Sequence, residues 1–120
     1  MQSNIFAKVE PLVKEMKLNL DCDNFIKFLN QHYRSGAWIY PSAVHRSLNV
    51  NIVEVYKVLE ACEEVGIVQQ YLQIYCPYCQ HFTGISYKSI FDIPEEVSCV
   101  HCDNEIQMPS KHAAIIYKVL

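Results

Sequence analysis

The stretch from residue 76 to residue 102 reads CPYCQHFTGISYKSIFDIPEEVSCVHC and decides much of the fold. It begins and ends with a pair of cysteines separated by two residues, and 19 residues lie between the pairs. A two-residue spacer lets both sulfurs of a turn face one ion, and two such turns supply a tetrahedron of thiolates. The spacing therefore predicts a zinc site formed by Cys76, Cys79, Cys99 and Cys102.

Four thiolates would fill the coordination shell, whereas a catalytic zinc keeps one position open for water, so the predicted role of the metal is structural. A redox-active CxxC pair is an alternative, but it needs a βαβ context that this region lacks. An iron–sulfur cluster also uses four cysteines, but its characteristic spacing is missing here. His81 and His101 are expected to lie at the surface or to pack against neighbouring side chains. Cys22 and Cys62 are expected to be buried structural thiols.

The cysteine pairs resemble the knuckles of the zinc-ribbon family, whose usual text is Cys-Pro-x-Cys-Gly. Gln80 and Asp103 stand where that family prefers glycine, a position that often needs an unusual backbone angle. Asn104 is a candidate for that angle in the second knuckle. Residues 85–93, ISYKSIFDI, are expected to form a hairpin that holds the two knuckles together.

The sequence before the cysteines predicts three helices, over residues 21–34, 41–48 and 51–65, because apolar residues recur there at helical spacing. Asn51 is a suitable N-cap for the last helix, Glu54 would complete a capping box, and Gly66 ends it. Asn49 is suited to a left-handed turn just before this helix. Short β-prone runs are expected at residues 37–40 and 67–75.

This order of elements resembles the winged helix-turn-helix family. The stretch YPSAVHRSLNVNIVEVYKVLEACEEVGIVQQ, residues 40–70, shares that family's Pro-Ser helix start, its four-residue turn and its Leu-Glu-x-x-Glu-x-Gly ending, here one residue longer. A winged helix followed by a four-cysteine ribbon is also similar to the large subunit of archaeal transcription factor E and its eukaryotic relatives. That resemblance implies an adaptor, although winged helices bind DNA, RNA or protein and the fold alone does not choose among them.

The predicted fold class is therefore α+β, with N-terminal helices and a winged helix-turn-helix followed by a small β zinc ribbon. The predicted boundaries are 1–18 for an N-terminal helical segment, 19–75 for the winged helix and 76–120 for the ribbon with a C-terminal strand. Residues 4–18 carry an apolar stripe that must pack on the following domain or on a partner, as one kinked helix or two pieces around Pro11. The sequence leaves open whether the ribbon follows the wing or is inserted in it, with residues 113–119 returning beside 67–75.

Charge and composition limit the classes of function. The 120 residues carry 10 Lys and Arg against 13 Asp and Glu, a formal net charge of −3, and four zinc-bound thiolates would add about two negative charges. Such a balance disfavours a solitary DNA binder, and the length excludes a large multidomain enzyme. No apolar run reaches the roughly 20 residues of a membrane span, and a cytoplasmic location is expected, where thiols stay reduced for metal binding.

Two sets of residues are candidates for a binding surface. For nucleic acid, the candidates are Arg46, Asn51 and Lys57, because the helix over 51–65 would present Asn51, Glu54, Lys57, Ala61 and Glu64 outward. For a protein partner, the candidates are Trp38, Ile39 and Tyr40, together with the N-terminal stripe and the strand over 113–119. The alternative for each is ordinary core packing, and for the strand it is a place as the last strand of the wing or ribbon sheet. The aromatic residues of the ribbon are expected to cover the metal site; they are Tyr75, Tyr78, Phe82, Tyr87 and Phe91.

The sequence shows no pattern typical of an active site, such as a Gly-rich phosphate loop or HExxH. We therefore expect a non-enzymatic, zinc-stabilised adaptor or accessory subunit that acts through protein–protein contacts, with no membrane and no small-molecule substrate. One alternative is a DNA-binding transcription regulator that acts as a dimer. A further alternative is a CxxC redox protein. The partner and the oligomeric state are not defined by the sequence.

Overall fold

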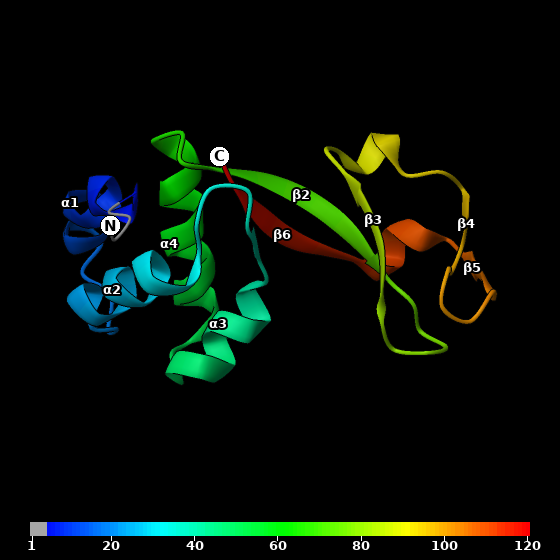
Figure 1. The fold of residues 1–120 in the computed structure, drawn as a ribbon, viewed down its shortest axis with the longest axis horizontal. Coiled ribbons are helices and arrows are strands. Elements are labelled where there is room, and N and C mark those ends of the chain that lie inside the picture. Colours follow the sequence, from blue (N-terminus) through cyan, green and yellow to red (C-terminus); the bar gives the residue numbers. More distant parts are fainter. Residues whose placement is uncertain (1–4) are drawn as a thin grey trace. The chain divides into compact units, whose positions relative to one another are not determined.

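A computed structural model describes residues 5–120, with helices in the first part of the chain and antiparallel strands in the second (Figure 1). The α+β class predicted from the sequence is confirmed. The chain divides into two compact units: a first unit up to Gln69 that also includes Tyr117–Leu120, and a second unit over Gln70–Ile116. This division differs from the predicted boundaries, because the N-terminal segment and the end of the chain both belong to the first unit. No helix in the described part of the chain is long and apolar enough to cross a membrane.

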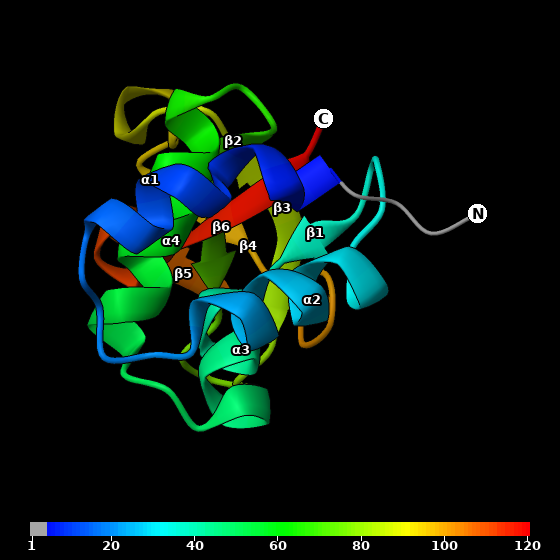
Figure 2. The ribbon, with the colours of Figure 1, turned by 90° about the vertical axis from the view of Figure 1, so that its left-hand side faces the viewer.

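The N-terminal segment forms two pieces, the 3₁₀-helix η1 (Ile5–Val9) and the helix α1 (Glu10–Glu15). They meet one residue before Pro11, which lacks an N–H and fits only the first turn of a helix. The segment packs on α2 (Cys22–His32) and α4 (Ile52–Glu64) within the first unit (Figure 2). Its apolar stripe therefore belongs to the core; its buried members are Phe6, Val9 and Val13. The first four residues of the predicted segment lie outside the described residues.

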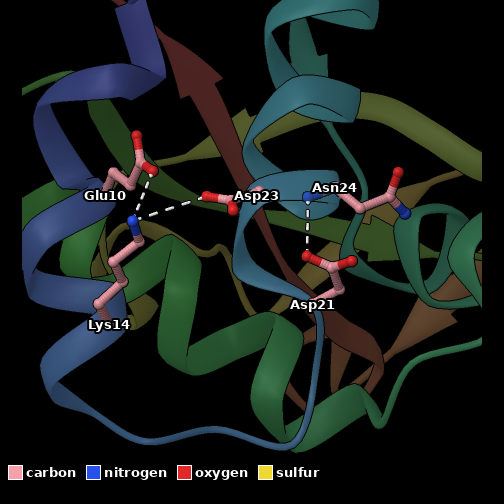
Figure 3. Close-up of polar contacts among 5 residues, drawn as sticks. All are labelled: Glu10, Lys14, Asp21, Asp23 and Asn24. Atoms are coloured by element: carbon pink, nitrogen blue, oxygen red, sulfur yellow. Dashed lines mark hydrogen bonds and ion pairs between the residues drawn. The ribbon is translucent and has the colours of Figure 1, made fainter.

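Polar contacts also join α1 to the start of α2 (Figure 3). Lys14 Nζ lies 3.1 Å from Glu10 Oε1 and 3.7 Å from Asp23 Oδ1. The hydrogen bond and charge of Glu10, followed by the charge of Asp23, raise the pKa of Lys14. Asp21 is the N-cap of α2, and its Oδ1 accepts a hydrogen bond from the backbone N–H of Asn24 at 3.2 Å.

The connection between α3 (Pro41–Leu48) and α4 follows the predicted local signals with one exception. Asn49 adopts a left-handed conformation with φ 52°, and the Asn51 side chain accepts from the N–H of Val53 at 2.8 Å. The predicted capping box is wrong. Glu54 instead accepts a hydrogen bond from the backbone N–H of Asn19 at 2.7 Å, so it ties α4 to the connection between α1 and α2.

The end of α4 is a Schellman motif. Gly66 has φ 80°, its N–H donates to Glu63, and the N–H of Ile67 donates to Cys62 at 3.1 Å. Only glycine adopts this left-handed conformation without a steric penalty from Cβ. The turn leads the chain directly into β2 (Val68–Tyr75).

The larger sheet has four strands in the order β1-β6-β2-β3. Its other members are β1 (Trp38–Ile39), β3 (Phe82–Tyr87) and β6 (Ala113–Val119). β6 pairs antiparallel with β1 and is also a neighbour of β2, so it has a strand on each side. The C-terminal strand thus returns beside β2, and the cysteine-containing residues are inserted between these two strands.

In the second unit, β2 and β3 form one hairpin and β4 (Glu96–Ser98) and β5 (Glu105–Gln107) form another. The short helices η2 (Ile90–Asp92) and η3 (Pro109–His112) flank the second hairpin in sequence. The predicted hairpin over residues 85–93 is wrong, because the first part of this stretch pairs with β2 and residues 90–92 form η2. Each hairpin instead carries its own cysteine pair at its turn.

Candidate metal centre and binding surfaces

The two cysteine turns have the same backbone hydrogen bonds. The N–H of Cys76 donates to His81 at 2.8 Å, and Cys76 accepts from the N–H of Gln80 at 2.9 Å. The equivalent bonds at Cys99, to Asn104 and from Asp103, are both 2.9 Å. In each turn these bonds join the first cysteine to the two residues that follow the second cysteine. This closed turn lets both sulfurs of the pair face one ion.

The residue after each cysteine pair is left-handed, although neither is glycine. Gln80 has φ 61° and Asp103 has φ 59°. Asn104, the residue expected to take this angle in the second turn, does not; Asp103 takes it instead. Asn104 contributes differently, because its Nδ2 donates to Cys102 Sγ at 3.4 Å.

The four sulfurs of Cys76, Cys79, Cys99 and Cys102 all lie within 4.8 Å of one another and form a possible metal site. Cys76 Sγ lies 3.7 Å from Cys102 Sγ, and Cys79 Sγ lies 3.6 Å from Cys99 Sγ. A tetrahedral zinc with bonds of about 2.3 Å would separate its sulfurs by about 3.8 Å. A disulfide would need a sulfur separation of about 2.05 Å, so these distances fit a shared ion and not disulfide bonds.

The sulfurs are partly sealed from water by apolar residues of the same unit. Cys76 and Cys99 are buried, and Ile74 and Ile106, each on the strand adjoining a cysteine turn, are fully buried against them. Other residues that pack on this cluster are Tyr87, Ile93 and Ala113. Of the aromatic residues expected to cover the metal site, Tyr87 does so, while Tyr78 and Phe91 are exposed.

The protonation of the thiols follows from this packing. Desolvation and the neighbouring thiols raise the pKa of Cys79 to about 12 in the absence of a metal. A bound divalent cation would reverse this preference, because it stabilises the thiolate directly. Cys79 therefore lacks the lowered pKa that activates the cysteines of redox-active CxxC pairs.

The remaining cysteines and the neighbouring histidines do not belong to the cluster of four sulfurs. Cys62 is buried in α4, and desolvation raises its pKa to about 12; Cys22 is half-buried at the start of α2. His81 and His101 are exposed, with ring centroids 5.7 Å apart. The cluster of possible metal ligands consists of the four cysteines, without these histidines.

The candidate nucleic-acid residues Arg46, Asn51 and Lys57 are all exposed in the first unit. The Oδ1 atom of Asn51 is already used to cap α4. Ala61 was predicted to face outward, but it is buried, because the N-terminal segment packs along this side of α4. The accessible face of α4 is therefore narrower than the sequence suggests. It carries exposed carboxylates at Glu60, Glu63 and Glu64.

The candidate partner residues Trp38, Ile39 and Tyr40 do not form one surface. Ile39 is 0% exposed and pairs with Tyr117 in the sheet, which removes it from any contact surface. Trp38 is half-buried, with Lys118 Nζ 5.3 Å from the centre of its ring. β6 has a strand on each side and is not an unpaired edge.

Sequence reasoning missed the exposure of several large apolar side chains in the second unit. Seven of the eleven large apolar side chains that are exposed within the described residues belong to this unit; they are Tyr75, Tyr78, Ile85, Ile90, Phe91, Val100 and Met108. The signal was the pattern around Phe91, where Ser89, Asp92 and Pro94 are typical of a short turn and not of a buried strand.

No protein-family model, curated protein or solved structure matches this chain. Its function must therefore be inferred from the geometry of its own residues.

Proposed function

We propose that this protein is a non-enzymatic, zinc-stabilised winged-helix module that acts as an adaptor or accessory subunit through protein–protein contacts. The observation that carries the proposal is the side chain of Phe91 in the second unit, which is 93% exposed. Aromatic side chains of this kind are favoured at the centres of protein interfaces. A reducing compartment such as the cytoplasm would keep the four thiols available for the metal.

The proposed metal is Zn²⁺, held by Cys76, Cys79, Cys99 and Cys102. The sulfur separations support a tetrahedral site, and four thiolates leave no coordination position for water or substrate. The zinc would therefore stabilise the second unit, whose small core consists of a few residues around the sulfurs. The role of this zinc would be structural and not catalytic.

The proposed winged helix rests on the order of elements along the chain. Three helices, α2, α3 and α4, are followed by strands, and β1, β6 and β2 are neighbours in one sheet. In a winged helix the hairpin formed by the last two strands is the wing. The zinc ribbon would be inserted at that hairpin, between β2 and β6.

Binding of DNA through α4 is the second candidate function, and the charges disfavour it. Lys57 is the one basic residue of α4, against Glu54, Glu60, Glu63 and Glu64 on the same helix. Phosphate binding depends on neutralising several negative charges with Lys or Arg, which α4 does not offer. Dimerisation, or a basic partner, would be needed to place Asn51 and Lys57 at a duplex.

Two experiments test the proposal. The first is a mobility-shift titration of the purified full chain with mixed DNA duplexes over a range of salt concentrations, for which we expect no tight binding. Tight binding that is lost in the Asn51→Ala/Lys57→Ala double variant, but kept in the exposed-lysine control Lys27→Ala, would overturn the adaptor proposal.

The second experiment asks for the partner directly. A tagged chain at its native level should migrate in a stoichiometric complex, and that complex should form again from purified components. A chain that migrates on its own in extracts, and cross-links to no protein above the level of a tag-only control, would contradict an adaptor role.

A further inference from the structure

The second unit contains an open apolar groove of about 590 Å³. One wall is η2 with the turn that follows it, over residues 90–96, and the other is the end of β5 with the start of η3, over residues 107–110. The apolar lining consists of Ile90, Phe91, Ile93, Pro94, Met108 and Pro109.

The most exposed apolar side chains of the groove stand on walls with ordered backbones. On one wall, Ser89 Oγ accepts from the N–H of Phe91 at 3.2 Å, which fixes the turn that presents this ring. On the other wall, the Met108 residue is 57% exposed and its backbone is left-handed, with φ 52°. Its carbonyl accepts a hydrogen bond from the N–H of Lys111 at 3.0 Å. A backbone that is held in place before binding loses little conformational entropy when a ligand covers it.

The groove is negatively charged at one end. Glu95 and Glu96 line it, and both are exposed. Glu105, on the facing strand, hydrogen-bonds to Glu96 and repels its charge, which raises the pKa of Glu96. Among the described residues, neither Glu95 nor Glu96 forms an ion pair with a lysine or arginine. A cation supplied by a ligand would therefore relieve a repulsion that the protein itself leaves in place.

We infer that this groove binds a peptide segment of a partner protein in which an apolar or aromatic side chain is flanked by lysine or arginine. The apolar side chain would lie between Phe91 and Met108, and the cation would lie against Glu95 and Glu96. This inference rests on the proposed adaptor function and specifies the chemistry of the partner.

The charge of the groove selects this occupant over others. Nucleic acids and anionic lipid surfaces carry negative charge, which Glu95 and Glu96 repel. A second copy of this chain, docked groove to groove about a two-fold axis, would bring the same carboxylates together from both molecules. A basic, apolar peptide meets both the apolar walls and the acidic end.

The test begins with a random peptide library displayed on phage, selected against the zinc-loaded full chain. The expected result is enrichment of peptides that carry an apolar or aromatic residue next to lysine or arginine. A selection that enriches no peptide, or enriches peptides without basic residues, would overturn the inference.

The enriched peptide, labelled with fluorescein, is then measured by fluorescence anisotropy. Its affinity should fall at least about tenfold with Phe91→Ser, and similarly with the double variant Glu95→Gln/Glu96→Gln. Two matched controls should change the affinity less than about twofold. They are Val53→Ser, an exposed apolar residue of α4 outside the groove lining, and Glu15→Gln, an exposed carboxylate on α1. Zinc content and circular dichroism must match the parent for each variant. An affinity that Phe91→Ser leaves unchanged would place the peptide elsewhere and overturn the inference.

Two further outcomes separate this inference from the function it rests on. A native partner complex that survives Phe91→Ser would remove the groove as the docking site and leave the adaptor function standing. Self-association of the purified chain that Phe91→Ser abolishes would assign the groove to a second copy, and would also overturn the inference. Failure to find any native partner complex tests the adaptor function itself.

Discussion

Gln80 and Asp103 occupy the same place in the two cysteine turns, and both have a left-handed backbone, with φ 61° and 59°. The backbone N–H of each donates to the first cysteine of its own turn at 2.9 Å. The two turns are thus equivalent in geometry although their sequences, CPYCQ and CVHCD, share only the cysteines. The candidate metal site is built from one local structure used twice.

We predict that Gln80→Gly stabilises the second unit by about 1 kcal/mol, because a left-handed residue with a Cβ is strained and glycine is not. Asp103→Gly should act in the same direction by a smaller amount, since Asp tolerates this conformation better than Gln. Chemical unfolding of the zinc-loaded protein measures both. Val100→Gly, inside the second turn but not at a left-handed position, serves as the control and should not stabilise. A loss of stability in Gln80→Gly would contradict the assigned backbone geometry.

Removal of one ligand should unfold the second unit selectively. The parent protein should contain one zinc per chain, and Cys76→Ser should lose the metal together with the hydrogen-exchange protection of residues 70–116. Chelation of the parent should have the same effect. Cys22→Ser, which removes a half-buried cysteine outside the cluster, should keep both the zinc and the protection. A metal-free parent in which residues 70–116 are protected would rule out the proposed role of zinc.

The N-terminal segment should depend on apolar burial and not on its ion pairs. Phe6 is fully buried, and Phe6→Ala should lower the free energy of unfolding by about 3–5 kcal/mol through loss of contacts and creation of a cavity. Lys14→Ala should have little effect, because its contacts with Glu10 and Asp23 are at the surface and are screened by solvent. Urea unfolding of the two variants beside the parent tests the contrast; equal effects would contradict it.

The first unit should become unstable at alkaline pH. Burial, and then the charges of Glu60 and Glu63, raise the pKa of Tyr117 above its ordinary value of 10.0. The unfolded chain therefore releases this proton first, so the stability that the neutral hydroxyl contributes is fully present below pH 10 and is lost as the pH rises above it. One such group changes the free energy of unfolding by at most about 1.4 kcal/mol per pH unit.

Tyr117→Phe tests this dependence, because it removes the titrating hydroxyl and keeps the ring. We expect its thermal midpoint to decline less steeply than that of the parent above pH 10. Tyr78→Phe, at an exposed position of the other unit, should follow the parent curve. Parallel curves for Tyr117→Phe and the parent would show that another group controls alkaline unfolding.

Much of the local structure could be predicted because its causes lie within a few residues. The cap at Asn51, the left-handed turn at Asn49 and the stop at Gly66 each depend on hydrogen bonds or backbone angles of adjacent residues. The cysteine pairs could be predicted for the same reason, because the two-residue spacer within each turn is enough to place its two sulfurs on one side.

Errors occurred where a residue had a choice of distant partners. Glu54 stands at the position that a capping box requires, yet its carboxylate accepts a hydrogen bond from the N–H of Asn19, which is distant in sequence. Ala61 lay on the outer side of an isolated helix, yet the N-terminal segment covers it. The apolar pattern along one helix indicates which side of the helix is apolar. It does not indicate which other segment of the chain packs against the helix.

The sequence by itself determined the α+β class, the helix ends and which four cysteines cluster, because short-range sterics, hydrogen bonding and spacing suffice for these. Only the tertiary structure decided that β6 lies between β1 and β2, that Ile39 is buried, and that Tyr87 packs near the sulfurs while Phe91 stands in a groove. These outcomes depend on strand pairing and packing between distant segments. A small core buries only some of the apolar side chains, and which of them are buried depends on the segments that lie next to them in three dimensions.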